Sequence, residues 1–218
     1  MGFPKGAAVV VKISEIRHVR SLVCIILDNG ESYWLRRDDL PGTGFMENES
    51  FSSDTFSHWI RIRQYPRALN LAVSMLARRP CSKHEIRQKL LHHRYTAEVT
   101  ELVLFKLEKE QLLNDTEFCE QWIRYRLSCK YGLSAIHREL RIKGIPEEMI
   151  LEALEKTNPD ENTNNAFSLA VKQWKKIRKE EDPYKTRQKI ISYLVRKGYD
   201  WSSAKEACMK AEQETQNK

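Results

Sequence analysis

The chain has 218 residues, of which 41% are apolar and 31% are charged, and its formal net charge is +7. This composition predicts a soluble protein with a folded core, and the longest apolar run near the start, residues 7–11, is too short for a signal-peptide core or a membrane span. Five cysteines without a CxxC pair indicate reduced thiols and a cytoplasmic location, and the positive charge permits an anionic partner, either nucleic acid or an acidic protein surface.

Residues 1–53 are expected to form a β-hairpin or three-stranded region followed by a loop. Runs rich in β-branched and aromatic residues lie on both sides of Asn29-Gly30. An Asn-Gly pair in that setting favours a tight hairpin in which both turn residues have positive φ. Residues 41–53 are rich in Pro, Gly, Ser and Asn and are predicted to be loop. Three strands alone would be marginally stable, so the sheet must pack against the helical part of the chain.

The pattern is helical after the loop. Asp54 is expected to cap a short helix that Pro66 interrupts, because proline removes a helical hydrogen bond. Beyond Ala68 the apolar spacing stays helical, and three stretches resemble one another at spacings of 50 and 54 residues. The residues aligned in this way are Ile86, Ile136 and Ile190; Leu90, Leu140 and Leu194; Tyr95, Ile145 and Tyr199; and Val103, Ala153 and Ala207.

An amphipathic helix precedes each of these stretches, so the repeated unit is predicted to be three helices. Capping signals agree, since Ser82 with Glu85 fits a capping box and Asp182 precedes a proline. Tandem units near 50 residues long bury their faces on one another. We therefore expect a mainly α-helical fold with a tandem array of three three-helix repeats. The expected divisions are 1–53 for the β-hairpin region and loop, 54–113 for the short helix and repeat 1, 114–159 for repeat 2, and 160–218 for repeat 3 with a polar tail.

The repeats carry motifs that resemble those of the RecX family, bacterial modulators of the RecA recombinase. The motifs are ALNLAVSMLARRPCSKHEIRQKLLHHRY in repeat 1, LEKEQLLNDTEFCEQWIRYR before repeat 2, and GLSAIHRELRIKGIPEEMILEAL within repeat 2. The resemblance covers residues 9–211 and is strongest over 68–155. It implies a regulator that binds along the groove of the RecA–DNA filament and alters ATP hydrolysis, strand exchange and the SOS and recombinational repair response, usually by inhibition. Stimulation stays open as the other direction.

The resemblance implies the RecA filament as partner, together with single-stranded DNA and, as a second candidate, double-stranded DNA. We expect a monomer without membrane contact. Two alternatives stay open. A plain DNA-binding helical-repeat module would show steep salt dependence on naked DNA. A helical scaffold for some other protein would need neither DNA nor a recombinase.

Charge is distributed unevenly within the repeats, because the middle helices are basic and the third helices of repeats 1 and 2 begin with acids. Such acids argue against a helix-turn-helix that inserts its last helix into the DNA major groove, where carboxylates would lie near phosphates. Residues 166–197 hold ten Lys or Arg and three acids, a net +7 that equals the whole excess of the chain. A solvated lysine-rich face is the alternative to a binding surface. The candidate partner-binding and DNA-binding residues are Arg87, Lys89, Arg94, Arg138, Arg141, Lys143, Lys175, Lys176, Arg178, Arg187, Lys189, Arg196 and Lys197.

Reactive groups form no recognisable constellation in the sequence. Cys81-x-x-His84 lacks a second ligand pair at zinc-finger spacing, and no Gly-rich phosphate loop, GxSxG or HExxH motif occurs. We therefore predict no metal, no cofactor and no enzymatic activity. Tyr199 and Trp201 lie near a basic bend, where they could either stack on bases or close the last repeat.

Overall fold

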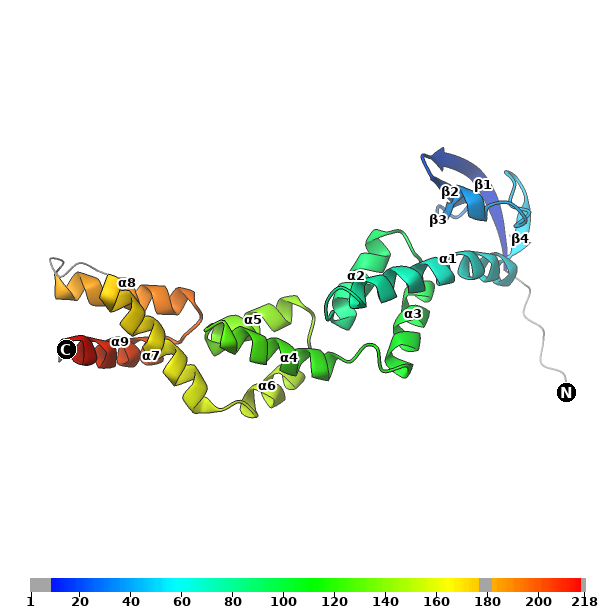
Figure 1. Ribbon diagram of the computed structural model, residues 1–218. Coiled ribbons are helices and arrows are strands. Elements are labelled where there is room, and N and C mark those ends of the chain that lie inside the picture. Colours follow the sequence, from blue (N-terminus) through cyan, green and yellow to red (C-terminus); the bar gives the residue numbers. More distant parts are fainter. Residues whose placement is uncertain (1–8, 177–181, 217–218) are drawn as a thin grey trace. The chain divides into compact units, whose positions relative to one another are not determined.

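The computed structural model describes residues 9–176 and 182–216, and it divides into two compact units, Met1–Leu113 and Asn114–Lys218. In the first unit a small antiparallel sheet is followed by helices, and the described part of the second unit is helical (Figure 1). The structure confirms the predicted fold class, a mainly α-helical protein with a small N-terminal strand region.

The sheet has four strands in the order β3-β2-β1-β4, one strand more than predicted. The expectation of loop throughout residues 41–53 is wrong at its end, where Phe51 lies opposite Val11 in an antiparallel ladder. A three-residue strand is too short to show a period in the sequence, and it forms here because β1 offers it an edge. The elements are β1 (Val10–Val19), β2 (Leu22–Leu27), β3 (Ser32–Arg36), the 3-10 turn η1 (Arg37–Asp39) and β4 (Ser50–Ser52).

The turn between β2 and β3 also differs from the prediction. Gly30 has a positive φ of 85°, but Asn29 does not, so the tight turn with two positive φ values is wrong. The main-chain N–H of Leu27 donates to the carbonyl of Glu31 at 2.9 Å and closes a wider turn. Asn29 contributes through its side chain, whose Oδ1 accepts the N–H of Glu31 at 2.9 Å. Such local side-chain bonds are the reason that Asn favours turns of several kinds.

Helix α1 (Ser53–Leu76) runs through Pro66, so the predicted interruption at this proline is wrong. The first part of the helix packs into the core of the sheet through Phe56 and Ile60, and the second part packs into the core of repeat 1 through Ala68. Burial on both sides of the proline stabilises the turns that its missing N–H weakens. Pro66 itself is exposed, so the carbonyl it leaves without a helical partner can bond to water.

Polar side chains connect α1 to the sheet and to repeat 1. Ser52 caps the helix by accepting a main-chain N–H of the first turn, a role that the sequence pattern assigns to Asp54. Inside the helix, buried Gln64 donates to the main-chain carbonyl of Trp34 in β3 at 2.7 Å and accepts the N–H of Thr96 at 2.9 Å. The side-chain amide of Gln64 thus supplies a hydrogen-bond partner to a carbonyl of β3 and to an N–H at the start of a later helix, and these two bonds fix the position of α1 between them.

Each repeat contains three helices, as predicted. The middle helix of each ends at a residue with positive φ, namely Arg94 (66°), Gly144 (74°) and Gly198 (94°), and this left-handed conformation commonly closes a helix. The second part of α1 begins repeat 1, and the other helices are α2 (Lys83–His92), α3 (Ala97–Lys109), α4 (Asp115–Ser128), α5 (Leu133–Ile142), α6 (Glu147–Glu155), α7 (Pro159–Lys176), α8 (Pro183–Arg196) and α9 (Trp201–Gln216).

The residues aligned by the repeat spacing form the cores of the repeats. Tyr95 is partly buried, and each of the other aligned residues is at most 5% exposed. The capping box of Ser82 with Glu85 is present, and Asp182 caps α8 with proline at the first helical position. The repeat period therefore identified core positions, because residues that face one packed interior recur with the same helical spacing.

Within the second unit, the end of α8 meets the start of α5. The N–H of Gly132 donates to the carbonyl of Lys197 at 2.9 Å, and the N–H of Ser134 donates to the carbonyl of Gly198 at 3.1 Å. The hydroxyl of Tyr199 donates to a main-chain carbonyl at the end of α4. Repeats 2 and 3 are thus joined by hydrogen bonds as well as by apolar contact.

Candidate partner-binding surface

Several predicted cations are paired inside their own repeats. Arg87 in α2 donates twice to Glu101 in α3, at 2.7 and 3.0 Å, and this pairing lowers the pKa of Glu101. Arg187 in α8 donates twice to Glu212 in α9, at 2.8 Å each. These bidentate pairs hold the middle helix to the third helix, so Arg87 and Arg187 serve packing in this structure.

The pair in repeat 3 has an equivalent in repeat 1. Lys83 pairs with Glu108 at 2.6 Å, and both residues lie 104 positions before Arg187 and Glu212, which is the sum of the two repeat spacings. In repeat 2 the carboxylate of Glu147 pairs with His137 (2.7 Å) and Arg141 (3.8 Å). Acids of the third helices therefore neutralise part of the basic middle helices, which the sequence showed only as two separate charge patterns.

Other predicted cations extend from the surface. Among the described residues, six are exposed and form no ion pair: Lys89, Arg94, Arg138, Lys175, Lys176 and Arg196. Lys189 is exposed and has an interaction within the chain. Arg178 lies outside the described residues. The exposed cations are available to anionic groups such as phosphates.

Cations and aromatic rings alternate in a continuous series of contacts from repeat 2 into repeat 3, which we name the aromatic row. Lys143 Nζ lies 4.1 Å from the ring centre of Trp122, Arg126 Cζ lies 5.8 Å from Trp122 and 3.6 Å from Tyr131, and Lys197 Nζ lies 4.2 Å from Tyr131. All five side chains are half-buried. Each contact is a cation–π interaction, so the row holds three positive charges on a defined aromatic support.

Glu139 fixes the centre of the aromatic row. Its carboxylate accepts the indole N–H of Trp122 at 3.0 Å and a guanidinium N–H of Arg126. Beside the row, Tyr125 is 55% exposed, with its ring centre 6.0 Å from that of Trp122. A ring that stays exposed beside ordered cations can stack on a base or on a partner's side chain. The amphipathic spacing of the sequence favours core positions for Trp122 and Tyr125, and the exposure of Tyr125 departs from that expectation.

Repeat 1 has a related contact, in which Arg94 Cζ lies 5.6 Å from the ring centre of Trp34. Arg94, Lys143 and Lys197 all stand at the end of a middle helix, and in each repeat that cation lies on an aromatic ring. These three predicted residues therefore combine a structural contact with partial exposure of their charge.

The two aromatic residues near the last bend have different environments. Tyr199 is 2% exposed, and its hydroxyl donates to the carbonyl of Lys130 at 3.1 Å, so it closes the junction between repeats and is not available for stacking. Burial also raises the pKa of this phenol. Trp201 is 62% exposed, with Lys205 Nζ 5.1 Å from its ring centre.

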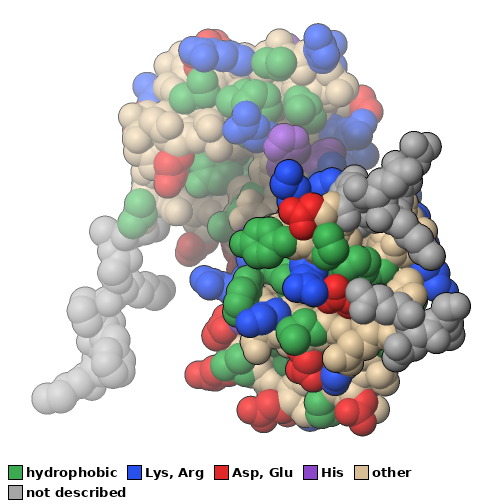
Figure 2. Space-filling model, turned by 90° about the vertical axis from the view of Figure 1, so that its left-hand side faces the viewer, with side chains coloured by type: hydrophobic (Ala, Val, Ile, Leu, Met, Phe, Trp, Pro, Cys, Tyr) green, Lys and Arg blue, Asp and Glu red, His purple; other side chains and the backbone are tan. Residues whose placement is uncertain are grey.

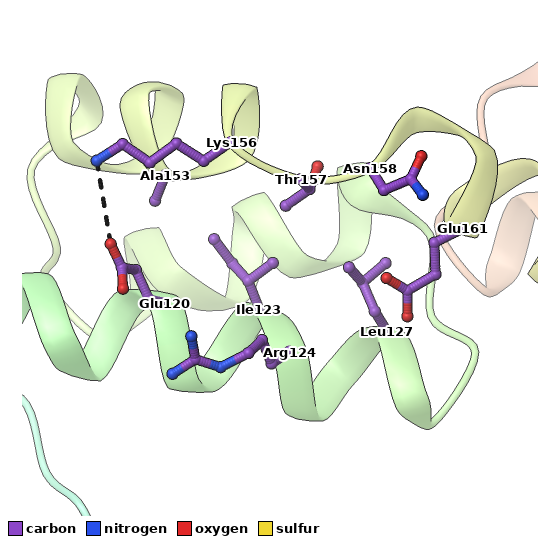
Figure 3. Close-up of a pocket in the computed structure, with 9 residues that line it drawn as sticks. All are labelled: Glu120, Ile123, Arg124, Leu127, Ala153, Lys156, Thr157, Asn158 and Glu161. Carbon is purple, nitrogen blue, oxygen red and sulfur yellow. Dashed lines mark ion pairs between the residues drawn. The ribbon is translucent and has the colours of Figure 1, made fainter.

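A pocket of about 310 Å³ lies between α4 and the segment after α6 (Figure 3). Ile123, Leu127 and Ala153 supply its apolar lining, and Lys156 reaches toward Glu120 across it at 4.0 Å (Figure 3). The rim carries both signs of charge, from Glu120 and Glu161 and from Arg124 and Lys156.

No group of three or more His, Cys, Asp or Glu side chains in the described residues could hold a metal ion. None of the helices in residues 9–176 and 182–216 combines the length and the apolar character needed to cross a membrane.

The fold and its surface define a helical-repeat protein, and comparison with known proteins places it more closely. Three family models match, one to each repeat: the RecX first three-helix domain at residues 68–107, the second at 114–154 and the third at 160–208. The chain belongs to the RecX family, as the sequence motifs indicated.

Individual relatives agree with this placement. A protein named regulatory protein RecX from Prosthecochloris aestuarii is 34% identical over 135 residues, which cover 62% of this chain and 86% of the relative. One from Clostridium acetobutylicum is 28% identical over 196 residues, covering 88% and 91%. The crystal structure of a regulatory protein RecX has the same fold, with a TM-score of 0.60 and 24% identity over 88% of this chain and 96% of that one. The RecX structure from Lactobacillus salivarius gives 0.62, with 19% identity over 69% and 97%.

Proposed function

We propose that this protein is a non-enzymatic, cytoplasmic regulator of the RecA recombinase. It binds as a monomer along the groove of the RecA–DNA filament and inhibits ATP hydrolysis and strand exchange, and in this way it moderates the SOS response and recombinational repair. Support comes from membership of the RecX family, whose curated relatives are named regulatory proteins, and from a surface that carries exposed cations and exposed aromatic rings.

The exposed cations together with the aromatic row carry this proposal. Lys89, Arg138 and Arg196 extend from the three middle helices without internal ion pairs among the described residues, and each can neutralise a phosphate. Tyr125 beside the row offers a ring to a base or to a protein side chain. The residues proposed to contact DNA or protein are Lys89, Arg94, Arg138, Arg141, Lys143, Lys175, Lys176, Arg178, Lys189, Arg196 and Lys197, and Arg87 and Arg187 contribute through their helices.

The test is DNA-dependent ATP hydrolysis by the RecA of the same organism, with this protein added in sub-stoichiometric amounts. A filament regulator blocks many protomers per molecule, so the rate should fall well below a one-to-one ratio. An unchanged rate, with the protein folded and bound to bare DNA, would favour the plain DNA-binding module instead.

The surface is tested by reversing two of its charges. Arg138→Glu with Arg141→Glu should weaken inhibition at least tenfold and leave the melting temperature nearly unchanged, because both side chains are exposed. Lys109→Glu with Arg124→Glu is the matched control, because it reverses two exposed charges outside the middle helices. Inhibition that survives the double reversal would remove the middle helices from the binding surface.

A further inference from the structure

Repeat 3 has an open groove between α8 and α9 that encloses about 570 Å³. Its apolar lining includes Tyr184, Ile191, Trp201 and Met209, and its cations are Arg187 and Lys205. Tyr184 is 65% exposed, Trp201 62% and Met209 50%. Figure 2 views the described part of repeat 3 and shows hydrophobic side chains gathered there, with charged side chains of both signs among them. Large apolar side chains grouped in this way on a surface mark an interaction site.

Comparison with repeat 1 shows what opens the groove. Ile191 and Lys205 lie 104 positions after Arg87 and Glu101, the bidentate pair that bridges α2 and α3. In repeat 3 the arginine of this pair is replaced by an apolar residue and the carboxylate by a lysine. No bridge can form, so the space between the two helices stays accessible.

Lys205 keeps a free positive charge at the edge of the groove. No acid lies one turn before or after it on α9, and its neighbour Glu206 pairs with Lys210 at 2.6 Å. Its Nζ rests 5.1 Å from the ring centre of Trp201 and forms no ion pair among the described residues. The other charges that line the groove, Arg187 and Glu212, neutralise each other. The groove therefore presents an apolar floor with one net positive charge, and a carboxylate complements that charge.

We propose that this groove docks a short segment of the partner protein in which a large apolar side chain lies next to a carboxylate. The apolar side chain packs against the apolar lining between α8 and α9, and the carboxylate pairs with Lys205, which stands at the position of Glu101 in repeat 1. This inference rests on the proposed function, in which the partner is the recombinase filament. It assigns repeat 3 a protein-recognition site, distinct from the cations proposed to meet DNA.

Substitutions in the full-length protein test the groove. Trp201→Ala and Lys205→Glu should each raise the concentration needed for half-inhibition of the RecA ATPase at least tenfold, with affinity for bare single-stranded DNA changed less than twofold. Lys172→Glu is the matched control, because it makes the same charge change on a residue of the same repeat outside the groove. Inhibition that is unchanged in both groove variants, or a loss equal to that of the control, would overturn the proposal.

Photo-crosslinking identifies the occupant. Trp201 is replaced by p-benzoylphenylalanine, and the protein is irradiated on RecA filaments assembled on single-stranded DNA with a non-hydrolysable ATP analogue. A crosslink to the recombinase subunit is expected. The same probe at Tyr125, which is similarly exposed, is the control. A crosslink from position 201 to DNA alone would contradict protein docking. So would the absence of any crosslink from position 201 when the probe at position 125 does crosslink. If the unmodified protein leaves the ATPase unaffected, the proposed function fails first and this partner fails with it.

Discussion

A β-carbon on Gly132 would overlap the main chain of Gly198, and a β-carbon on Gly198 would overlap Ala135. Gly132 is the N-cap of α5, and Gly198 closes α8 with φ of 94°. The carbonyls of Lys197 and Gly198 at the end of α8 accept N–H groups at the start of α5, so the two helix ends satisfy each other's main-chain groups. Glycine at both positions is thus required by the close approach of two main chains.

Gly198→Ala should lower the free energy of unfolding of the second unit by more than the cost of placing alanine at a positive φ. Any alanine at positive φ costs about 1–2 kcal/mol, and overpacking at the junction adds about 1–3 kcal/mol. Gly30→Ala is the matched control, with φ of 85° and no atom within 4 Å of the added carbon. Urea unfolding gives the loss for each variant, and hydrogen exchange at the amides of Gly132 and Ser134 locates it. Equal losses in the two variants would contradict the steric role of the junction.

Pro66→Ala should stabilise the first unit. The alanine supplies an N–H for the carbonyl of Ile62 and removes the ring from a helix interior, where proline costs about 3 kcal/mol. Solvation of this exposed turn offsets part of that cost, so we expect a gain of about 1–2 kcal/mol in thermal unfolding. Pro146→Ala is the control, because Pro146 is the N-cap of α6 and removes no interior hydrogen bond. No gain at position 66 would mean that the helix is already distorted to fit its proline.

The Arg87–Glu101 pair should contribute pH-dependent stability. The folded pKa of Glu101 is lowered by its hydrogen bond and charge contact with Arg87, so the contribution is fully present above the unfolded pKa, near 4.5, and is lost as the pH falls through the lowered folded value. Glu101 is 56% exposed, and solvent screening limits the coupling to about 0.2–1 kcal/mol. A double-mutant cycle with Arg87→Gln and Glu101→Gln, measured from pH 7 down to pH 3, should show a coupling that is largest at pH 7 and falls as Glu101 is protonated. Lys89→Gln is the control, because Lys89 is a neighbouring cation that forms no ion pair among the described residues.

The rate of thiol alkylation should distinguish the exposed cysteine from the buried ones. Cys129 is exposed, whereas burial raises the pKa of Cys119 to about 11, which leaves few thiolates at pH 8. Iodoacetamide at pH 8 should modify Cys129 first and Cys119 only after denaturation, as peptide mass spectrometry would show. Cys208, also buried and with a raised pKa, is an internal reference. Comparable rates for Cys119 and Cys129 in the folded protein would indicate that α4 opens readily.

Local periodicity in the sequence predicted the repeat cores. Ile86, Ile136 and Ile190 line up at the repeat spacing, and each is buried because a helix with one apolar face places the same positions in each core. The continuity of α1 through Pro66 could not be predicted in this way. It depends on two cores that form on either side of the proline, and those cores are tertiary.

The candidate surface was predictable in its charges but not in their partners. Lys89 and Arg187 look alike in the sequence, and only the folded geometry shows that one is free while the other is held by Glu212. The junction between repeats 2 and 3, in contrast, is indicated by a feature of the sequence. Gly132 lines up with Ser82, the N-cap of α2, and a helix start without a capping side chain suggests that another group supplies the partner.

Because α1 is shared between two cores, the sheet and repeat 1 cannot be separated without disrupting one of them. Domains joined by a flexible linker can be separated by a single cut in the linker. Here, in contrast, a single helix contributes side chains to the core of the sheet and to the core of repeat 1. Cutting the chain after Ser52 would leave Phe56 and Ile60 bare on the helix that remains, and cutting after Arg67 would take the first turns of α1 away from repeat 1. Because one helix belongs to both cores, unfolding of the sheet and unfolding of repeat 1 should be coupled.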